Sequence, residues 1–516
     1  MIDTEAQRKL GYRKKTTLLI ASFFILHLSL AFILELGNDE AYYWFYTQHL
    51  QWNYFDHPPL VAVWAKIFTA NLLLDDYEVF VRLGSVVGCA LSTWFMFKAV
   101  ALLHSEKAGW FAAILYNTSF YASIVAGIFI MPDAPQMIFW TLAMWMFVGV
   151  LKNNRSWGYW VWFGIATGLC IMSKVHGMFL WIGLIAYCSQ KKREWLNTPH
   201  IYVSLLITAI VASPILIWNA ANDFVTYRFH SERVNIIGWA VNFKNFLPEL
   251  LGQFFFNNPF NVVLIFISLF ALKQKKLAFS GSSFFLWTGL PLVIILLFVS
   301  LFRPIFPHWS GPGYVSLIPV AAIYLADTHK RNFPGWLHWS VAGFLVFVIA
   351  MPLIISFYPG TWGSTKEQNY GHGDVSLDRY GWRSAGKEFR NYFRKAVVND
   401  SVPAKSPLVC NTWWGAHVEY YFARPAGTTM IGLNAMHEIH QYGWTNEFRK
   451  HSVDMSTAFS IVPSDEFYDA PKHYSTYYNN IQLVKTIQVN RRGMKARHFN
   501  VYRLSGWKGW RTNQHK

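Results

Sequence analysis

The chain has 516 residues, of which 53% are hydrophobic and only 14% are charged. Soluble domains carry about 25% charged residues, so this composition excludes an ordinary soluble protein and predicts a polytopic membrane protein. The formal net charge of +17 is high enough to suit nucleic acid, but many lysines and arginines lie in short loops between apolar segments. There they set the topology and contact anionic lipid, so we expect membrane lipids and no nucleic acid as partners.

About eleven apolar segments approach the roughly 20 residues that a membrane-spanning helix needs. They lie near residues 16–35, 78–103, 108–127, 134–151, 157–173, 176–190, 200–218, 249–272, 283–302, 312–327 and 336–358. We therefore expect an α-helical membrane protein with about 11 to 13 transmembrane helices. The shorter stretch 59–74 is expected to form an interfacial or re-entrant helix, because Pro58 and Pro59 suit the first turn of a helix and not its interior.

Basic residues fall in alternate loops of this predicted topology, and cytoplasmic loops are the ones enriched in lysine and arginine. The basic loops contain, in order, Lys107, Lys152, Lys191, Lys273 and Lys330. If these loops are cytoplasmic, the N-terminus is cytoplasmic too. An odd number of spans then places the C-terminal segment on the outer side of the membrane.

The chain becomes polar from about residue 359. Short runs typical of strands lie at 408–410, 428–433, 458–462, 481–489 and 498–504, and a helical pattern lies at 382–393. This alternation is typical of a small α/β domain. We therefore expect two domains, a transmembrane catalytic domain at 1–358 and an α/β domain at 359–516.

Two adjacent carboxylates, Asp39 and Glu40, follow the first predicted span. An ionisable residue at membrane depth costs roughly 2.5 to 3.5 kcal/mol on insertion scales, so it marks a functional site by default. The alternative is that the pair caps a helix starting near Ala41. We expect Asp39 and Glu40 to act in catalysis, because the other polar clusters of the membrane region fall on the same side.

Two further outer loops bring charged residues to this side of the membrane. Asp133 follows Pro132 at the start of a span, where it is either a second acid that contacts substrate or metal, or an ordinary helix N-terminal residue. Lys174 goes against the cytoplasmic preference of lysine. It either binds an anionic headgroup or extends its side chain along the membrane surface.

The remaining outer loops contribute arginine and histidine. Arg228 and Arg233 suit the bidentate binding of phosphate, and His230 between them is a common type of metal ligand, although an ordinary solvated loop is the alternative. His308 precedes Trp309, which can simply anchor the loop at the interface. Together the outer loops suit a reaction with a lipid-borne phosphate, because carboxylates can remove a proton and cations can hold the phosphate as it leaves.

The order of these residues resembles the bacterial members of the dolichyl-phosphate-mannose protein mannosyltransferase superfamily, the GT-C enzymes that include the aminoarabinose transferases of lipid A. The matching motifs are the Asp39-Glu40 pair, Tyr54-Phe55-Asp56-His57-Pro58-Pro59, Met131-Pro132-Asp133, Lys174 to Gly177, Trp218-Asn219 with the Arg228 to Arg233 loop, and Pro307-His308-Trp309. The resemblance covers the membrane region. It implies a GT-C fold in the inner membrane of a bacterium, with the C-terminal domain in the periplasm.

The resemblance also implies a function. It predicts an inverting glycosyltransferase that moves a sugar from a polyprenyl phosphate, usually undecaprenyl phosphate, to a hydroxyl of lipid A or lipopolysaccharide, a polysaccharide or a protein. Asp39 is implied as the catalytic base with Glu40 beside it, and a divalent metal is implied on Asp56 and a loop histidine, for which His230 is the candidate. The residues expected to bind the donor phosphate are Lys174, Arg228, Arg233, His308 and His57.

One position departs from the aminoarabinose transferases. His57 stands where that subgroup has a lysine before the two prolines, which leaves the identity of the sugar open. The main alternative function is a transporter or flippase, which is expected to carry ionisable residues in the middle of its spans and an internal repeat. A non-catalytic scaffold whose C-terminal segment binds partners is a third possibility.

Overall fold

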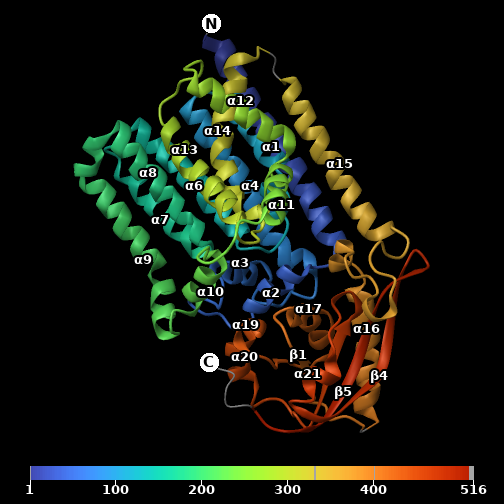
Figure 1. Ribbon diagram of the computed structural model, residues 1–516. Coiled ribbons are helices and arrows are strands. Elements are labelled where there is room, and N and C mark those ends of the chain that lie inside the picture. The colour runs from blue at the N-terminus through green and yellow to red at the C-terminus, as the bar shows by residue number, and fades with distance from the viewer. Residues whose placement is uncertain (1, 331–332, 400, 511–516) are drawn as a thin grey trace. The chain divides into compact units, whose positions relative to one another are not determined.

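The computed structural model describes residues 2–330, 333–399 and 401–510, and the chain forms two compact units (Figure 1). The membrane unit consists of the chain up to Ala31 and the segment Leu50–Val348. The C-terminal unit consists of Phe32–His49 and the chain from Ile349 onward. The segment that contains Asp39 and Glu40 therefore groups with the C-terminal unit, which the division predicted at residue 358 did not anticipate.

The membrane unit is a bundle of helices joined by short loops. Its longer helices are α1 (Ile2–Ile33), α4 (Glu78–Leu103), α6 (Asp133–Lys152), α7 (Trp157–Ser173), α9 (Pro199–Ala221), α13 (Ser282–Ser300), α14 (Gly311–Thr328) and α15 (Gly335–Phe357). Its shorter helices are α3 (Leu60–Phe68), α5 (Glu106–Thr118), α8 (Met178–Lys191), α10 (Val225–Val234), α11 (Phe243–Phe256) and α12 (Pro259–Lys273). Helix α6 packs against α4 and α7, α7 packs against α9, and α13 packs against α8 and α14.

Several of these helices can cross a membrane, as the apolar segments predicted. Within the described residues, six helices are long and apolar enough, and a seventh span results if α11 and α12 are counted together. The six are the Gly11–Ile33 part of α1 together with α4, α6, α9, α13 and α15. The total of 11 to 13 spans stays a prediction, because α5 has 13 residues and α8 has 14, fewer than the roughly 20 of a full span.

The continuous helix predicted at 249–272 is broken in the structure. Helices α11 and α12 meet at an angle of 93°, and Asn258 between them has a φ of 63°. Its side-chain amide donates hydrogen bonds to the backbone oxygens of Thr118 and Ser340 at 2.9 and 3.0 Å. Pro259, which has no N–H to donate, begins α12. The break is therefore fixed by tertiary hydrogen bonds as well as by local sequence.

The helix predicted at 108–127 also ends early. Helix α5 stops at Thr118, and a short π-helix follows at Tyr121–Val125. Phe120 at this turn packs against Phe344 and Phe347 of α15, with ring centroids 5.8 and 4.6 Å apart. This packing belongs to a buried apolar cluster and fixes the direction of the π-helix that follows.

The C-terminal unit contains a sheet, as the predicted α/β domain requires, and the structure shows that the sheet is mixed. Its strands are β1 (Leu408–Cys410), β2 (Met430–Gly432), β3 (Thr457–Pro463), β4 (Tyr478–Arg491) and β5 (Met494–Trp507), in the order β2-β1-β3-β5-β4. Strand β1 runs parallel to β2 and β3, while β5 pairs antiparallel with β3 and β4. Arg492 and Gly493 join β4 to β5 with φ of 51° and 78°, as in a two-residue hairpin loop.

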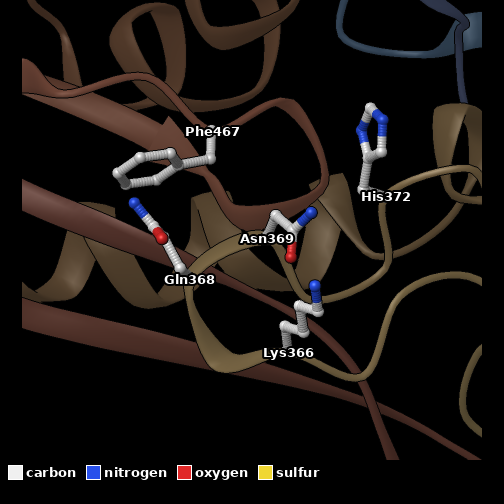
Figure 2. Close-up of a pocket in the computed structure, with 5 residues that line it drawn as sticks. All are labelled: Lys366, Gln368, Asn369, His372 and Phe467. Carbon is white, nitrogen blue, oxygen red and sulfur yellow. The ribbon is translucent and has the colours of Figure 1, made fainter.

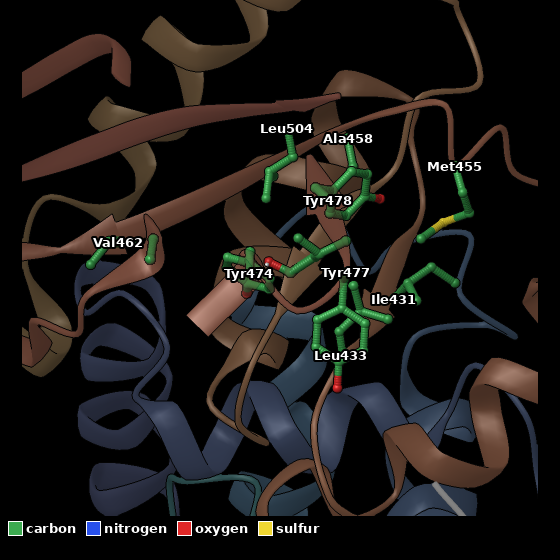
Figure 3. Packing of buried hydrophobic residues seen from close by; sticks show 11 residues of the cluster. Ile431, Leu433, Met455, Ala458, Val462, Tyr474, Tyr477, Tyr478 and Leu504 are labelled. Carbon is green, nitrogen blue, oxygen red and sulfur yellow. Dashed lines mark hydrogen bonds between the residues drawn. The ribbon is translucent and has the colours of Figure 1, made fainter. Parts of the chain in front are cut away.

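Helices cover this sheet and complete its core. Those that contact the strands are α16 (Trp382–Val398), α20 (Tyr442–Arg449) and α21 (Ala470–Tyr474). The unit also contains α2 (Asn38–Tyr46), which contacts α17 (Gly415–Val418), and α19 (Met436–Ile439), which contacts α20. One apolar cluster joins β-strand residues such as Val462 and Leu504 to Tyr474 of α21 (Figure 3). Phe393 of α16 packs against Phe459 of β3 at 5.7 Å between ring centroids. The predicted α/β domain is therefore confirmed as a sheet with its own hydrophobic core.

The surface of the C-terminal unit carries a hollow of about 370 Å³. It is lined by Lys366, Gln368, Asn369, His372 and Phe467 (Figure 2). His372 is held in place by a hydrogen bond between its Nδ1 and the backbone oxygen of Asp465 at 2.9 Å. None of the residues predicted for the site lines this hollow.

Candidate functional site

Asp133 and Lys174 form a buried ion pair in the membrane unit. The Nζ of Lys174 lies 3.0 Å from Oδ1 and 2.9 Å from Oδ2 of Asp133, and the two residues are 4% and 0% exposed. Tyr121 in the π-helix donates its hydroxyl proton to Oδ1 of Asp133 at 2.8 Å. Because Asp133 begins α6 and Lys174 follows the end of α7, the packing of these helices brings the charges together.

Four histidines interact with this ion pair. His176 and His308 lie in short 3-10 helices at Val175–Gly177 and Pro307–Ser310, and both interact electrostatically with the lysine and the aspartate. His57 and His230 interact with the same lysine, and their rings are 5.9 Å apart. We call Asp133, Lys174, these four histidines and Arg233 the polar cluster of the membrane unit.

Burial keeps these histidines uncharged near neutral pH. Burial, followed by the charge of the nearby lysine, lowers the pKa of His176 to about 3 and that of His308 to about 4. Burial is also the main reason why the pKa of His57 lies well below its usual value and that of His230 is lowered. The neutral rings can each donate and accept a hydrogen bond, so the positive charge of the cluster comes from lysine and arginine.

Arg233 is oriented by three aromatic rings. Its guanidinium carbon lies 5.3 Å from the ring centroid of Phe229, 5.7 Å from that of Phe306 and 5.1 Å from that of Trp309. Cation–π contacts of this kind fix the plane of the guanidinium. The N–H groups then point from its edges, in the geometry that suits a phosphate or carboxylate.

Helix α10 is tied to the loop that contains Asp56. Thr226 donates its hydroxyl proton to the backbone oxygen of Tyr54 at 3.0 Å. Four residues further along the helix, His230 donates from Nε2 to the backbone oxygen of Asp56 at 2.6 Å. These bonds hold the Asp56–His57 segment against the helix that carries Arg233.

The metal site predicted on Asp56 and His230 stays a prediction. The Nε2 of His230 donates a hydrogen bond to the backbone oxygen of Asp56, so the neutral ring keeps a lone pair only on Nδ1. In the part of the chain that the structure describes, no group of three or more His, Cys, Asp or Glu side chains is placed to hold a metal ion.

The structure also describes the local surroundings of the remaining predicted site residues, Asp39, Glu40 and Arg228. Asp39 and Glu40 lie in the first turn of α2, in the C-terminal unit, where Asp39 is exposed and Glu40 is buried. A side-chain oxygen of Glu40 accepts a hydrogen bond from the backbone N–H of Gly37 at 3.0 Å, so this residue caps the helix. Arg228 lies on α10 with an exposed side chain.

Several residues that contact or belong to the polar cluster were not among the residues predicted for the site. Tyr121 donates a hydrogen bond to the ion pair, His176 interacts with it electrostatically, and Phe306 contacts Arg233. His176 is two residues from Lys174, which was a usable signal. Tyr121 lies in an aromatic run of apolar sequence, so only the turn after α5 reveals its role.

Parts of the chain are similar in sequence to known glycosyltransferases. Residues 56–218 match the family described as dolichyl-phosphate-mannose-protein mannosyltransferase. Over 292 residues the chain is 23% identical to the lipid A galacturonosyltransferase RgtD of Rhizobium johnstonii. The aligned region covers 56% of this chain and 60% of that protein. The matched region thus spans less than two thirds of the length of this relative.

Solved structures share the fold. The crystal structure of ArnT from Cupriavidus metallidurans in the apo state has a TM-score of 0.64 at 11% identity, and the match covers 95% of this chain and 98% of ArnT. The structure of the same protein bound to undecaprenyl phosphate has a TM-score of 0.63 at 11% identity, with 94% and 97% covered. The chain therefore shares the GT-C fold of these structures, and its residues 56–218 match the mannosyltransferase family.

Proposed function

We propose that the chain is an inverting glycosyltransferase that moves a sugar from a polyprenyl-phosphate donor to an acceptor hydroxyl on the periplasmic side of a bacterial inner membrane. The observation that carries the proposal is the polar cluster, in which Lys174 and Arg233 are held in fixed positions among neutral histidines. This combination suits the phosphate of a lipid donor. The fold shared with ArnT, which has been solved with undecaprenyl phosphate bound, supports the same class of donor.

The proposed reaction assigns separate tasks to Asp39 and to the polar cluster. Asp39 removes the proton from the acceptor hydroxyl, and the hydroxyl oxygen forms a bond with the anomeric carbon of the sugar. The bond between that carbon and the phosphate oxygen breaks, its electron pair stays on the phosphate, and polyprenyl phosphate leaves. Arg233 and Lys174 stabilise the charge that develops on the phosphate, and neutral histidines donate hydrogen bonds to it. General-base catalysis of this kind contributes about 10² to 10⁴ in rate.

The charge of Lys174 is balanced by Asp133 in the described structure, and Arg233 brings a second positive charge to the cluster. A phosphate that approaches the pair shares the lysine with the aspartate. Because the aspartate also accepts a hydrogen bond from Tyr121, its charge is partly compensated when the lysine turns toward the donor. Lys174 and Arg233 are therefore our first candidates for donor binding, followed by His308 and His57.

Lipid A is the first acceptor to test, because the curated relative is named as a lipid A galacturonosyltransferase. Purified protein in lipid nanodiscs is supplied with lipid A and with undecaprenyl phosphate carrying galacturonate or aminoarabinose, and both lipids are followed by mass spectrometry. We expect lipid A to gain the mass of one sugar while an equal amount of undecaprenyl phosphate is released. Absence of transfer in nanodiscs, together with movement of the donor across the membrane of sealed proteoliposomes, would instead support the transporter function.

A further inference from the structure

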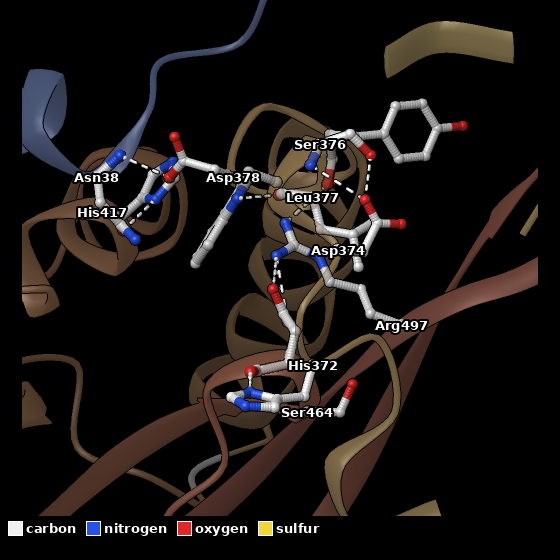
Figure 4. Close-up of polar contacts among 12 residues, drawn as sticks. Asn38, His372, Asp374, Ser376, Leu377, Asp378, His417, Ser464 and Arg497 are labelled. Carbon is white, nitrogen blue, oxygen red and sulfur yellow. Dashed lines mark hydrogen bonds and ion pairs between the residues drawn. The ribbon is translucent and has the colours of Figure 1, made fainter. Parts of the chain in front are cut away.

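Helix α2, which carries Asp39, is held inside the C-terminal unit by polar contacts on both sides of that residue (Figure 4). The backbone N–H of Asn38 donates to Oδ1 of Asp378 at 2.9 Å, and the side-chain oxygen of Asn38 lies 2.6 Å from Nδ1 of His417. On the other side, Nη2 of Arg379 lies 3.4 Å from a carboxylate oxygen of Glu40. The residues directly before and after Asp39 are therefore both attached to the C-terminal segment.

The residue that precedes α2 shows how close this attachment is. A Cβ atom at Gly37 would lie 2.5 Å from Oδ2 of Asp378 and 2.6 Å from Nη2 of Arg379. Gly37 has a φ of −86°, which any residue can adopt. A larger residue here would therefore have to displace the ends of these two side chains, whereas the backbone conformation would not be strained.

The segment before Gly37 is attached in the same way. The two carboxylate oxygens of Glu35 accept hydrogen bonds from the backbone N–H groups of Trp382 and Arg383, at 2.8 and 3.2 Å, at the start of α16. The backbone N–H of Leu36 donates to the hydroxyl of Tyr421 at 2.7 Å. A carboxylate at a helix N-terminus also interacts favourably with the helix dipole.

Aromatic side chains of α2 complete the contact. Phe45 stacks on Tyr442 with ring centroids 4.2 Å apart, and Trp44 meets Tyr420 edge to face at 4.9 Å. Aromatic pairs of this kind add to the stabilisation that apolar burial provides. The position of α2 is therefore set by the C-terminal unit over its whole length.

His417 connects α2 to the sheet. Its ring stacks on Trp382 with centroids 3.6 Å apart, and the guanidinium carbon of Arg497 lies 4.4 Å from the ring centroid of Trp382. Arg497, on β5, forms an ion pair with Asp465 at 3.0 Å. Burial, followed by the charge of Arg497, holds the pKa of His417 well below its usual value. The ring is neutral, so its Nδ1–H donates to the side-chain oxygen of Asn38.

We propose that Asp378, Arg379 and His417 are positioning residues for glycosyl transfer, which fix α2 so that Asp39 stands in the place where it removes the acceptor proton. The proposal rests on the function proposed above, in which Asp39 is the base. A misplacement of about 1 Å at a reacting group can lower a rate on the order of 100-fold. Supporting contacts of this kind therefore act on the catalytic step and not on the binding of the donor.

The test compares variants that break the contact with variants that preserve it. His417→Phe keeps the stacking on Trp382 and removes the Nδ1–H, whereas His417→Asn keeps a donor at nearly the same place. Asp378→Ala removes the acceptor for the Asn38 N–H, whereas Asp378→Asn retains one. We expect kcat to fall about 10- to 100-fold in His417→Phe and Asp378→Ala, with the donor KM unchanged within about twofold. We expect His417→Asn and Asp378→Asn to recover most of kcat.

A control variant separates positioning from stability. Val462→Ala removes buried apolar volume from the core of the sheet, so it lowers the melting temperature without touching residues 32–49, and we expect its kcat to stay within about twofold of wild type. Arg379→Gln serves as the milder variant, because the Arg379 side chain is partly exposed, at 20%, and glutamine keeps a hydrogen-bond donor at this position. A fall in kcat no greater than in Val462→Ala, or a change in KM instead of kcat, would overturn the proposal.

Asp39→Asn in the same assay distinguishes failure of this proposal from failure of the proposed function. An inactive Asp39→Asn together with fully active His417→Phe, Asp378→Ala and Arg379→Gln would leave the base assignment in place and remove the positioning role. An active Asp39→Asn would overturn both. Non-additive losses in the double variant Asn38→Ala/His417→Phe would support a single pathway through Asn38, and full additivity would contradict it.

Discussion

The Nζ atom of Lys174 lies within hydrogen-bond distance of both carboxylate oxygens of Asp133, in a part of the membrane unit that is closed to solvent. These two residues therefore form an ion pair, although the sequence places the acid in one outer loop and the cation in another. Each one compensates the charge of the other. Substitutions at either position therefore change stability as well as chemistry, and the two effects have to be measured separately.

Breaking this ion pair is expected to be costly. In Lys174→Met or Asp133→Asn, one partner stays buried without its counter-charge, which costs about 3 to 5 kcal/mol. We expect a marked fall in the melting temperature of both variants in detergent. The double variant Asp133→Asn/Lys174→Met has no unpaired charge, so its melting temperature should return toward that of wild type while its affinity for the donor stays low. Equal melting temperatures in the single and double variants would contradict this explanation.

The aromatic contacts of Arg233 provide a second prediction. Arg233→Lys retains the positive charge but loses the planar group that stacks on Phe229, Phe306 and Trp309. We expect donor affinity to fall about tenfold, since cation–π contacts are worth about 0.5 to 1 kcal/mol each at partly exposed sites. The matched control is Arg303→Lys, which removes a similar contact with Trp239 at 4.1 Å. Equal losses in the two variants would contradict a specific role of Arg233.

Stability should depend on pH through the buried histidines. A histidine whose pKa is lowered by folding binds fewer protons in the folded state than in the unfolded state at every pH between its folded pKa and about 6.5, so stability rises with pH across this window. The pKa of His308 is about 4, and the melting temperature should therefore fall as the pH is lowered from 6.5 toward 4.

His308→Gln tests this linkage, because it removes one of the titrating groups. We expect the melting temperature of this variant to depend less steeply on pH over the same range than that of wild type. His437→Gln is the control, since the side chain of His437 is 74% exposed. A slope in His308→Gln that equals the wild-type slope would show that His308 is protonated equally easily in the folded and unfolded chains.

The fold was largely predictable because long apolar segments and short alternating runs are local signals. The helices and strands follow these signals closely, and β3 at Thr457–Pro463 is an example, since the run predicted for it was 458–462. The early end of α5 and the break between α11 and α12 are exceptions. The Asn258-Pro259 dipeptide is itself a turn signal. Because the residues around it are apolar, the sequence nevertheless predicted one continuous helix at 249–272. The bonds from Asn258 to Thr118 and Ser340 come from distant parts of the chain.

The site was predictable only in part. The sequence indicates which outer loops hold ionisable residues, because charges near a membrane are rare. It does not indicate which residues pair, since Asn38 and His417 are 379 positions apart. Glu40 illustrates the same point. The sequence allowed both catalysis and capping, and the structure shows its carboxylate accepting the N–H of Gly37.

The most direct test of the central claim is the release of undecaprenyl phosphate by wild-type protein and by Asp39→Asn, each in nanodiscs with lipid A and the sugar donor that the wild type uses. We expect wild type to release undecaprenyl phosphate and the rate of release to fall at least about 100-fold in the variant, because a general base contributes about 10² to 10⁴ in rate. The same preparation should still bind the donor and melt at the wild-type temperature. Release at the wild-type rate by Asp39→Asn would contradict the account.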